Sequence, residues 1–351
     1  FFSMFFGSGN LLWPIEVGRV AGDHWIYGLL GFFLGGIALP ISAVLCMIHF
    51  KGDPFAFIKT IPAKLAWPFM TICVLVWVPL GAGPRCLEIS HGATVGLYST
   101  NVWGRHIFFV LYSLVVAYNL YHRDRILAFL GLYLTPMLLF FLCILVIRVF
   151  LSDPNYLPTE AAKSGMFIYA LEKGYNTMDF IAAFFFSSTL IGGLFRESNS
   201  TQYVMRKSIR AAIVGLFALS VVYSTLLYVG VYQSTILSDD HNILLGQMNI
   251  TFFENFAILP GMLIATACLT TSVAMADNLL IFTERFSKTV LNYSMNRRVS
   301  VSIAVLSSYF ATFMNNGHLQ LIQDKTLMVC CPLLFLWMSY VVIKNYWVQT
   351  R

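Results

Sequence analysis

Charged residues divide this chain into a series of long apolar windows. A stretch of about 20 apolar residues can cross a bilayer as a helix. The pattern therefore predicts an all-α, polytopic membrane protein with about ten transmembrane helices, because ten windows contain no Asp, Glu, Lys or Arg. These windows are residues 1–15, 24–50, 65–84, 106–122, 126–147, 180–195, 211–238, 255–276, 299–323 and 326–343.

The composition supports a membrane location for the whole chain. Of its 351 residues, 58% are hydrophobic and 11% are charged, whereas soluble domains carry about 25% charged residues. This excludes an ordinary soluble protein and predicts a single transmembrane domain over residues 1–351. Because the chain begins inside an apolar run, we expect the true N-terminus to be missing.

The basic residues indicate an orientation. Fifteen of the 22 Lys and Arg residues fall in alternate loops, and basic loops are retained on the cytoplasmic side. We therefore expect the start of the chain to be cytoplasmic. On this interpretation the net charge of +6 reflects basic loops that set the orientation in the membrane, and it implies no nucleic-acid partner.

A polar connection at about 152–174 leaves five windows on either side. Two halves with an odd number of spans cross the membrane in opposite senses, which is the inverted-repeat plan of many secondary transporters. The expected first repeat is about 1–151 and the second about 175–343, with the connection between them outside the cell.

Two windows contain residues that favour an interruption of the helix. The first holds Gly7-Ser8-Gly9-Asn10 followed by Pro14, and the sixth holds residues 186–189 followed by Gly192-Gly193. Glycine and proline weaken a helix, and interrupted helices at corresponding positions of two halves point to a transport site. The alternative is a kinked helix whose glycines allow close packing, as we expect for Gly28, Gly31, Gly35 and Gly36.

Other polar residues within or beside the windows have more than one interpretation. Thr270, Thr271 and Ser272 form a run of hydroxyls, which either bond back to the helix or bind a small cation. Arg85 lies three residues before Glu88, so one interpretation is that the two side chains form a structural ion pair. Asp179 is an interfacial carboxylate or helix cap, a gate residue, or a proton carrier; Asp277 is functional or approaches the cytoplasmic surface.

Several motifs resemble those of the bacterial branched-chain amino acid:cation symporters, the BrnQ or LIVCS family. The resemblance runs in order from the first to the ninth window. The motifs are F-F-G-S-G-N-L-L-W-P at 5–14, P-L at 79–80 with P-R at 84–85, G-Y-N-T-M-D at 174–179, A-C-L-T-T at 267–271 and L-I-Q at 321–323.

The resemblance implies the leucine-transporter fold, with 5+5 inverted repeats, broken helices 1 and 6 and two further spans after Lys344. It implies Na⁺-coupled symport of leucine, isoleucine or valine across the bacterial cytoplasmic (inner) membrane, with no cofactor besides the coupling ion. The implied substrate-binding residues are Gly7, Ser8, Gly9, Asn10, Phe184 and Ser187. The implied Na⁺ ligands are Ser3, Phe6, Ala267, Thr270 and Thr271.

Three positions depart from the family pattern, namely Glu88, Gly92 and Asp277, which we place beside the substrate route. The alternatives are therefore H⁺ coupling through Asp179, Glu88 or Asp277, or another amino acid as substrate. A membrane-embedded enzyme ranks lower because the sequence has no H-E-x-x-H or G-x-S-x-G motif. A channel also ranks lower, since the polar residues are concentrated at two breaks and one hydroxyl run.

Overall fold

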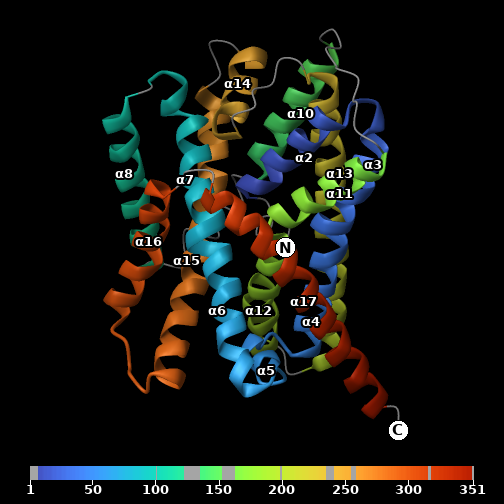
Figure 1. Ribbon diagram of the computed structural model, residues 1–351, viewed down its shortest axis with the longest axis vertical. Helices are drawn as coiled ribbons and strands as arrows, with labels where there is room; N and C mark the ends of the chain where they lie inside the picture. The colour runs from blue at the N-terminus through green and yellow to red at the C-terminus, as the bar shows by residue number, and fades with distance from the viewer. Residues whose placement is uncertain are drawn as a thin grey trace.

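The computed structural model describes residues 7–99, 101–121, 135–151, 163–197, 200–234, 241–253, 258–314 and 318–349. Every regular element within these ranges is a helix (Figure 1). The α-helices are α2 (Ser8–Ala21), α3 (Trp25–Phe33), α4 (Leu39–His49), α5 (Pro54–Ile58), α6 (Ala63–Trp77), α7 (Gly83–Gly92), α8 (Val102–Tyr121), α10 (Thr135–Leu151), α11 (Lys163–Asn176), α12 (Asp179–Glu197), α13 (Thr201–Tyr232), α14 (His241–Phe253), α15 (Ile258–Val290), α16 (Arg297–Phe313) and α17 (His318–Gln349). Short 3₁₀ segments, η1 (Gly22–His24) and η4 (Val95–Leu97), and π-helical segments, η2 (Leu34–Ala38) and η3 (Val78–Ala82), join some of them.

Among the described residues, six helical stretches are long and apolar enough to cross a membrane. The first, Gly9–His49, overlaps the first two predicted windows, and the others overlap the third, sixth, seventh, eighth and tenth. These are Ala63–Gly92, Lys163–Phe195, Gln202–Tyr232, Ile258–Val290 and Leu321–Lys344. The three remaining windows correspond to α8, α10 and α16. The prediction of a polytopic helical membrane protein is thus confirmed.

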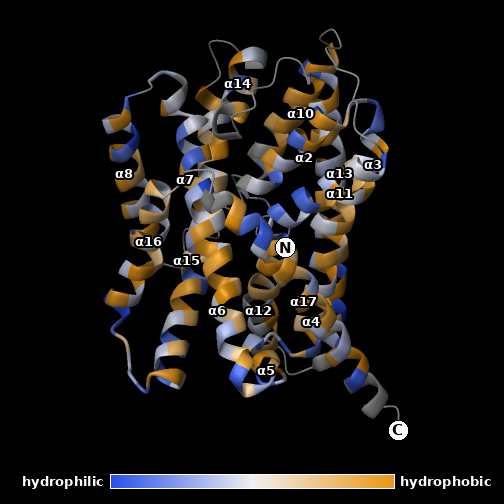
Figure 2. Cartoon of the chain, viewed as in Figure 1, coloured by the Kyte–Doolittle hydropathy of each residue, from blue (hydrophilic) through white to orange (hydrophobic). Residues whose placement is uncertain are grey.

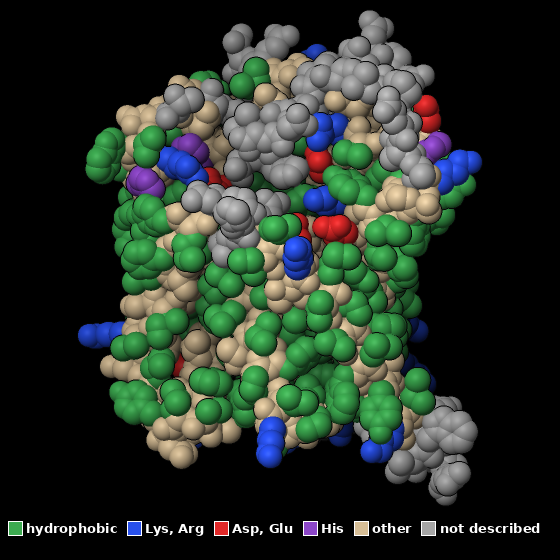
Figure 3. All heavy atoms as spheres, viewed as in Figure 1, with side chains coloured by type: hydrophobic (Ala, Val, Ile, Leu, Met, Phe, Trp, Pro, Cys, Tyr) green, Lys and Arg blue, Asp and Glu red, His purple; other side chains and the backbone are tan. Residues whose placement is uncertain are grey.

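The outer surface has the polarity expected of a protein surrounded by lipid. A broad band of the visible face is mainly hydrophobic, and charged side chains gather toward its upper part and its lower edge (Figures 2 and 3). Exposed apolar side chains recur at helical spacing, as Ile303, Leu306 and Phe310 do on α16. Such stripes would be costly in water and are stable against lipid chains.

Glycines allow two helix pairs to cross closely. A Cβ atom built on Gly18 of α2 would lie 1.9 Å from the carbonyl oxygen of Leu227 on α13, and one on Gly230 of α13 would lie 2.1 Å from the carbonyl oxygen of Ile15. Since atoms this close would overlap, only glycine fits at the two positions, and α2 packs mainly against α13.

The second close crossing joins α3 and η2 to α11. A Cβ on Gly31 would lie 2.2 Å from the carbonyl oxygen of Phe167, and one on Gly174 would lie 2.9 Å from the Cα atom of Gly35. The interpretation of Gly31 and Gly35 as packing glycines is confirmed.

Three details differ from the sequence-based expectation. Pro14 lies inside α2 without ending it, although it has no N–H to donate to the carbonyl oxygen of Asn10. Residues 163–174, expected in a polar connection, belong to helix α11, which packs against α3. The ninth predicted window, residues 299–323, is too long, because residues 318–323 already form the start of α17.

Candidate functional site

The first break predicted from the sequence falls where α2 begins, and the residues before Gly7 lie outside the described part of the chain. Gly7 is extended, with φ −114° and ψ −168°, and helix α2 begins at Ser8. The Gly7 N–H donates to Oδ1 of Asn10 at 3.1 Å, which stabilises the helix end. The first N–H groups of a helix have no partner within it and carry partial positive charge. The expected ligands Ser3 and Phe6 lie outside the described residues.

The second interruption lies at Thr177 and Met178, between α11 and α12. Met178 has φ +62°, a left-handed conformation that costs a residue with a side chain about 1–2 kcal/mol. The predicted break at residues 186–193 is wrong, because α12 runs without interruption from Asp179 to Glu197. The chain passes close to α12 at Gly52, where a Cβ would lie 2.5 Å from the Gly192 nitrogen, so the glycine is required at Gly52; a Cβ on Gly192 would come no nearer than 3.9 Å to the Gly52 carbonyl oxygen.

The two interruptions meet in the interior. A Cβ on Gly9 would lie 3.2 Å from the Thr177 Cα atom. The carbonyl oxygen of Asn176 accepts two hydrogen bonds, from Nε1 of Trp13 at 2.8 Å and from a guanidinium nitrogen of Arg85 at 2.6 Å. The Arg85 guanidinium also lies over the Trp13 ring, 4.9 Å from its centre. One carbonyl at the end of α11 therefore links α2 to α7.

A buried polar cluster joins the same two breaks to α13. The amide nitrogen of Asn10 donates to Oδ2 of Asp179 at 2.7 Å and also contacts the Tyr223 hydroxyl, which donates to the same Oδ2 at 2.5 Å. Asp179, the first residue of α12, is only 3% exposed, so its carboxyl group lies within the protein interior. Tyr223 has no sequence signal, because nothing distinguishes it from other aromatic residues of its window.

The hydroxyl run of α15 lies beside the first break. The Thr271 side chain would be 3.0 Å from a Cβ on Gly7. Thr270 and Thr271 donate their hydroxyl hydrogens to the Ala267 carbonyl oxygen, at 2.7 and 3.2 Å. The back-bonding interpretation of these hydroxyls is thus correct in this structure, while their oxygen lone pairs remain able to accept or to coordinate.

A model of the branched-chain amino acid transport protein family matches residues 1–349. The chain belongs to this family. It is 30% identical over 342 residues to a protein of Staphylococcus saprophyticus, covering 87% of this chain and 76% of that protein. Proteins of Staphylococcus aureus strains MRSA252 and USA300 are 28% identical over 345 residues, with the same coverage. All three are named "Putative branched-chain amino acid carrier protein".

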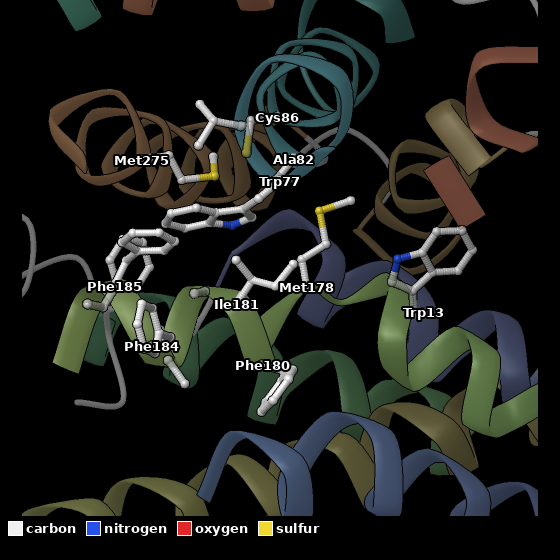
Figure 4. Close-up of a cluster of buried hydrophobic side chains, with 14 of the residues drawn as sticks. Trp13, Trp77, Ala82, Cys86, Met178, Phe180, Ile181, Phe184, Phe185 and Met275 are labelled. Atoms are coloured by element: carbon white, nitrogen blue, oxygen red, sulfur yellow. The ribbon is translucent and has the colours of Figure 1, made fainter. Parts of the chain in front are cut away.

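As a member of this family the protein is a branched-chain amino acid carrier of the bacterial membrane and not an enzyme. An apolar cluster suited to such substrates adjoins the second break of the transporter (Figure 4). Trp77 stacks on Phe185, with ring centres 5.3 Å apart, and Phe184 of the same helix is fully buried. Ser187, one turn further along α12, is buried, and its hydroxyl has no hydrogen-bond partner among the described residues.

The other acidic candidates of the transporter have separate environments. Glu88 forms an ion pair with Arg105 of α8, so the predicted pairing with Arg85 is wrong. Arg85 instead donates a hydrogen bond to the Asn176 carbonyl oxygen. Asp277 is 7% exposed, so its side chain is buried against the other helices that surround α15.

Proposed function

We propose that this transporter moves leucine, isoleucine or valine into the cytoplasm together with Na⁺, by alternating access. The observation that carries the proposal is the meeting, in the protein interior, of the start of α2 at Gly7 with the interruption at Thr177-Met178, with Thr271 beside Gly7. Interrupted helices at one buried point are the arrangement that binds substrates and coupling ions in secondary transporters.

The substrate carboxylate binds to the free N–H groups at the start of α2, from Ser8 to Asn10. The partial positive charge of a helix N-terminus favours an anion there. The branched side chain lies toward the apolar cluster around Phe184, and the unpartnered hydroxyl of Ser187 contributes a polar contact at its edge.

The coupling ion binds between α2 and α15. Na⁺ prefers neutral oxygen ligands of the kind supplied by helix ends in such transporters. Thr270, Thr271 and the Ala267 carbonyl supply such oxygens from α15; Ser3 and Phe6, the other ligands that the resemblance implies, lie outside the described residues. The contact between Thr271 and Gly7 supports this assignment, because it places the α15 oxygens beside the start of α2.

The same proposal includes two inverted repeats in the leucine-transporter fold. If the halves correspond, the first helix of each half contacts the second helix of the other. The main contacts of α2 with α13, and of α11–α12 with α3–α4, follow this rule. The second repeat then begins with α11, at Lys163, and the connecting segment of the single domain is shorter than 152–174.

The test is uptake of labelled leucine by liposomes containing the purified full-length protein. We expect uptake to require Na⁺ and to stop when choline replaces it. The double variant Thr270→Val, Thr271→Val should need about tenfold more Na⁺ for half-maximal uptake if the lost ligands contribute about 1.4 kcal/mol. Thr266→Val is the matched control, since Thr266 also bonds back to its helix, at Leu263.

The buried carboxylate of Asp179 favours one second candidate, an H⁺-coupled carrier. A pH gradient imposed without Na⁺ separates the two. Uptake driven by the pH gradient alone would contradict Na⁺ coupling, and absence of leucine uptake under both gradients would contradict the proposed function as a whole.

A further inference from the structure

Asp179 carries a charge that no side chain neutralises among the described residues. Its side-chain partners Asn10, Tyr223 and Thr177 are all neutral. Asn10 and Tyr223 both donate to Oδ2. Neutral donors stabilise a carboxylate but leave its charge in place, and a buried unpaired charge is costly.

The buried glutamates Glu16 and Glu88 are paired. Glu16 is bonded to Arg19 at 3.0 and 3.1 Å, and Glu88 is paired with Arg105. Two cations near the breaks have other contacts: Arg85 donates to the Asn176 carbonyl and lies over the Trp13 ring, and Lys173 lies over the Trp13 and Tyr169 rings. Asp179 thus stands out as a buried carboxylate that is oriented by hydrogen bonds and has no cationic partner in the described part of the chain.

The position of this carboxylate matches the shape of an amino acid. Asn10 lies in the first turn of α2, where the proposed carboxylate site is, and its side chain bonds directly to Asp179. The ammonium and carboxylate groups of an α-amino acid are attached to a single carbon, so their binding groups must be neighbours. Pro14 also leaves the Asn10 carbonyl oxygen without its helical donor, which adds a second acceptor near the same place.

We propose that Asp179, oriented by Asn10 and Tyr223, binds the α-ammonium group of the transported amino acid. The inference rests on the proposed function and adds a chemical requirement to it. Ligands must carry a free ammonium group, because this group supplies the positive charge that the described side chains around Asp179 do not. Charge-assisted hydrogen bonds are about twice as strong as neutral ones, so this contact contributes much of the selectivity.

The first test needs only the wild-type protein in detergent, with ligand-induced thermal stabilisation as the measurement. Leucine and leucinamide, which keep the ammonium group, should raise the melting temperature. The keto acid 4-methyl-2-oxopentanoate, which has the same side chain and carboxylate without the ammonium, should raise it little. Equal stabilisation by leucine and the keto acid would overturn the inference.

The second test uses Asp179→Asn, which has nearly the same shape. We expect leucine to bind at least about tenfold more weakly, which corresponds to the loss of about 1.4 kcal/mol, and we expect leucine–leucine exchange to be lost with it. A proton carrier would behave differently, because its amide variant loses gradient-driven uptake but still exchanges substrate. Retained binding and exchange in Asp179→Asn would therefore overturn the inference.

Controls separate this result from misfolding and from failure of the proposed function. Without ligand, Asp179→Asn should melt no lower than the wild type, because it removes an unpaired buried charge. The control Asp53→Asn changes an exposed carboxylate that caps α5, and leucine binding should be unchanged. If the wild type itself neither binds nor exchanges leucine, the proposed function fails. If the wild type and Asp179→Asn bind and exchange leucine equally well, the ammonium site alone is wrong.

Discussion

The crossing of α2 and α13 allows a quantitative prediction about how the site is held. A Cβ atom on Gly18 would lie 1.9 Å from the Leu227 carbonyl oxygen, whereas ordinary contacts begin at 3.4 Å. Gly18→Ala must therefore separate the two helices by about 1.5 Å at this point. The obstructing atoms belong to the α13 backbone, so no side-chain rotation can relieve the overlap.

The expected effect has a structural and a functional part. Overpacking of a tight interior typically costs about 1–3 kcal/mol, and backbone atoms cannot yield, so we expect the upper part of that range. Because Asn10 and Tyr223 lie on these same two helices, the displacement also disturbs their shared contacts with Asp179. Leucine uptake should fall together with the melting temperature.

The measurement is the melting temperature of the detergent-solubilised protein, combined with uptake in liposomes. Gly193→Ala is the matched control, because no atom lies within 4 Å of its Cβ and Ala stabilises a helix interior by roughly 0.5–1 kcal/mol. Gly230→Ala obstructs the same crossing, so the double variant with Gly18→Ala should be less destabilised than the sum of the single changes. A Gly18→Ala protein as stable as Gly193→Ala would refute the packing argument.

Three further changes address the site directly. Ser187→Ala should raise the melting temperature without ligand, because it removes a buried unpartnered hydroxyl, and should reduce the additional stabilisation by leucine; an unchanged leucine effect would place Ser187 outside the substrate contact. Trp13→Phe leaves the Asn176 carbonyl with one donor fewer and should lower stability by about 1–3 kcal/mol, measured by thermal melting against wild type. Glu88→Gln should cost less than about 1 kcal/mol, because Arg105 is 39% exposed, and it should leave the order of preference among leucine, isoleucine and valine unchanged in uptake competition.

The membrane fold was predictable because its signals are local. Each apolar window overlaps a helix, and the start of α2 at Ser8 lies within the glycine-containing run that suggested a break in the first window. The interruption between α11 and α12 could not be predicted, since Thr177 and Met178 have no unusual intrinsic tendency to end a helix. Their conformation depends on distant residues: Gly9 leaves room for Thr177, and Gly81 leaves room for the Met178 side chain.

At residues 186–193 the error is the opposite one, because a local signal for a break is present but the helix is not interrupted. Gly192 resembles a helix breaker in the sequence, but within a membrane the backbone hydrogen bonds of a helix have no competing solvent. The turn that passes α12 depends on Gly52, where φ is +78°, and a Cβ on Gly192 would lie 3.9 Å from the Gly52 carbonyl oxygen. Glycine in a membrane helix therefore need not mark an interruption; at Gly18 it marks a close contact, and only the tertiary neighbours distinguish these cases.

The packing separates many of the helices into two groups, with the proposed site between them. In one group α2 packs on α13, and α11–α12 pack on α3–α4; in the other α7 packs on α15, with α8 and α16 alongside. Contacts between the groups at the breaks include Thr271 against Gly7, Met178 against Gly81, and Arg85 with Asn176. A ligand can shift an equilibrium only through contacts that differ between two states. An amino acid and a cation bound among these few contacts would touch both groups at once, so their binding free energy acts directly on the relative position of the two groups.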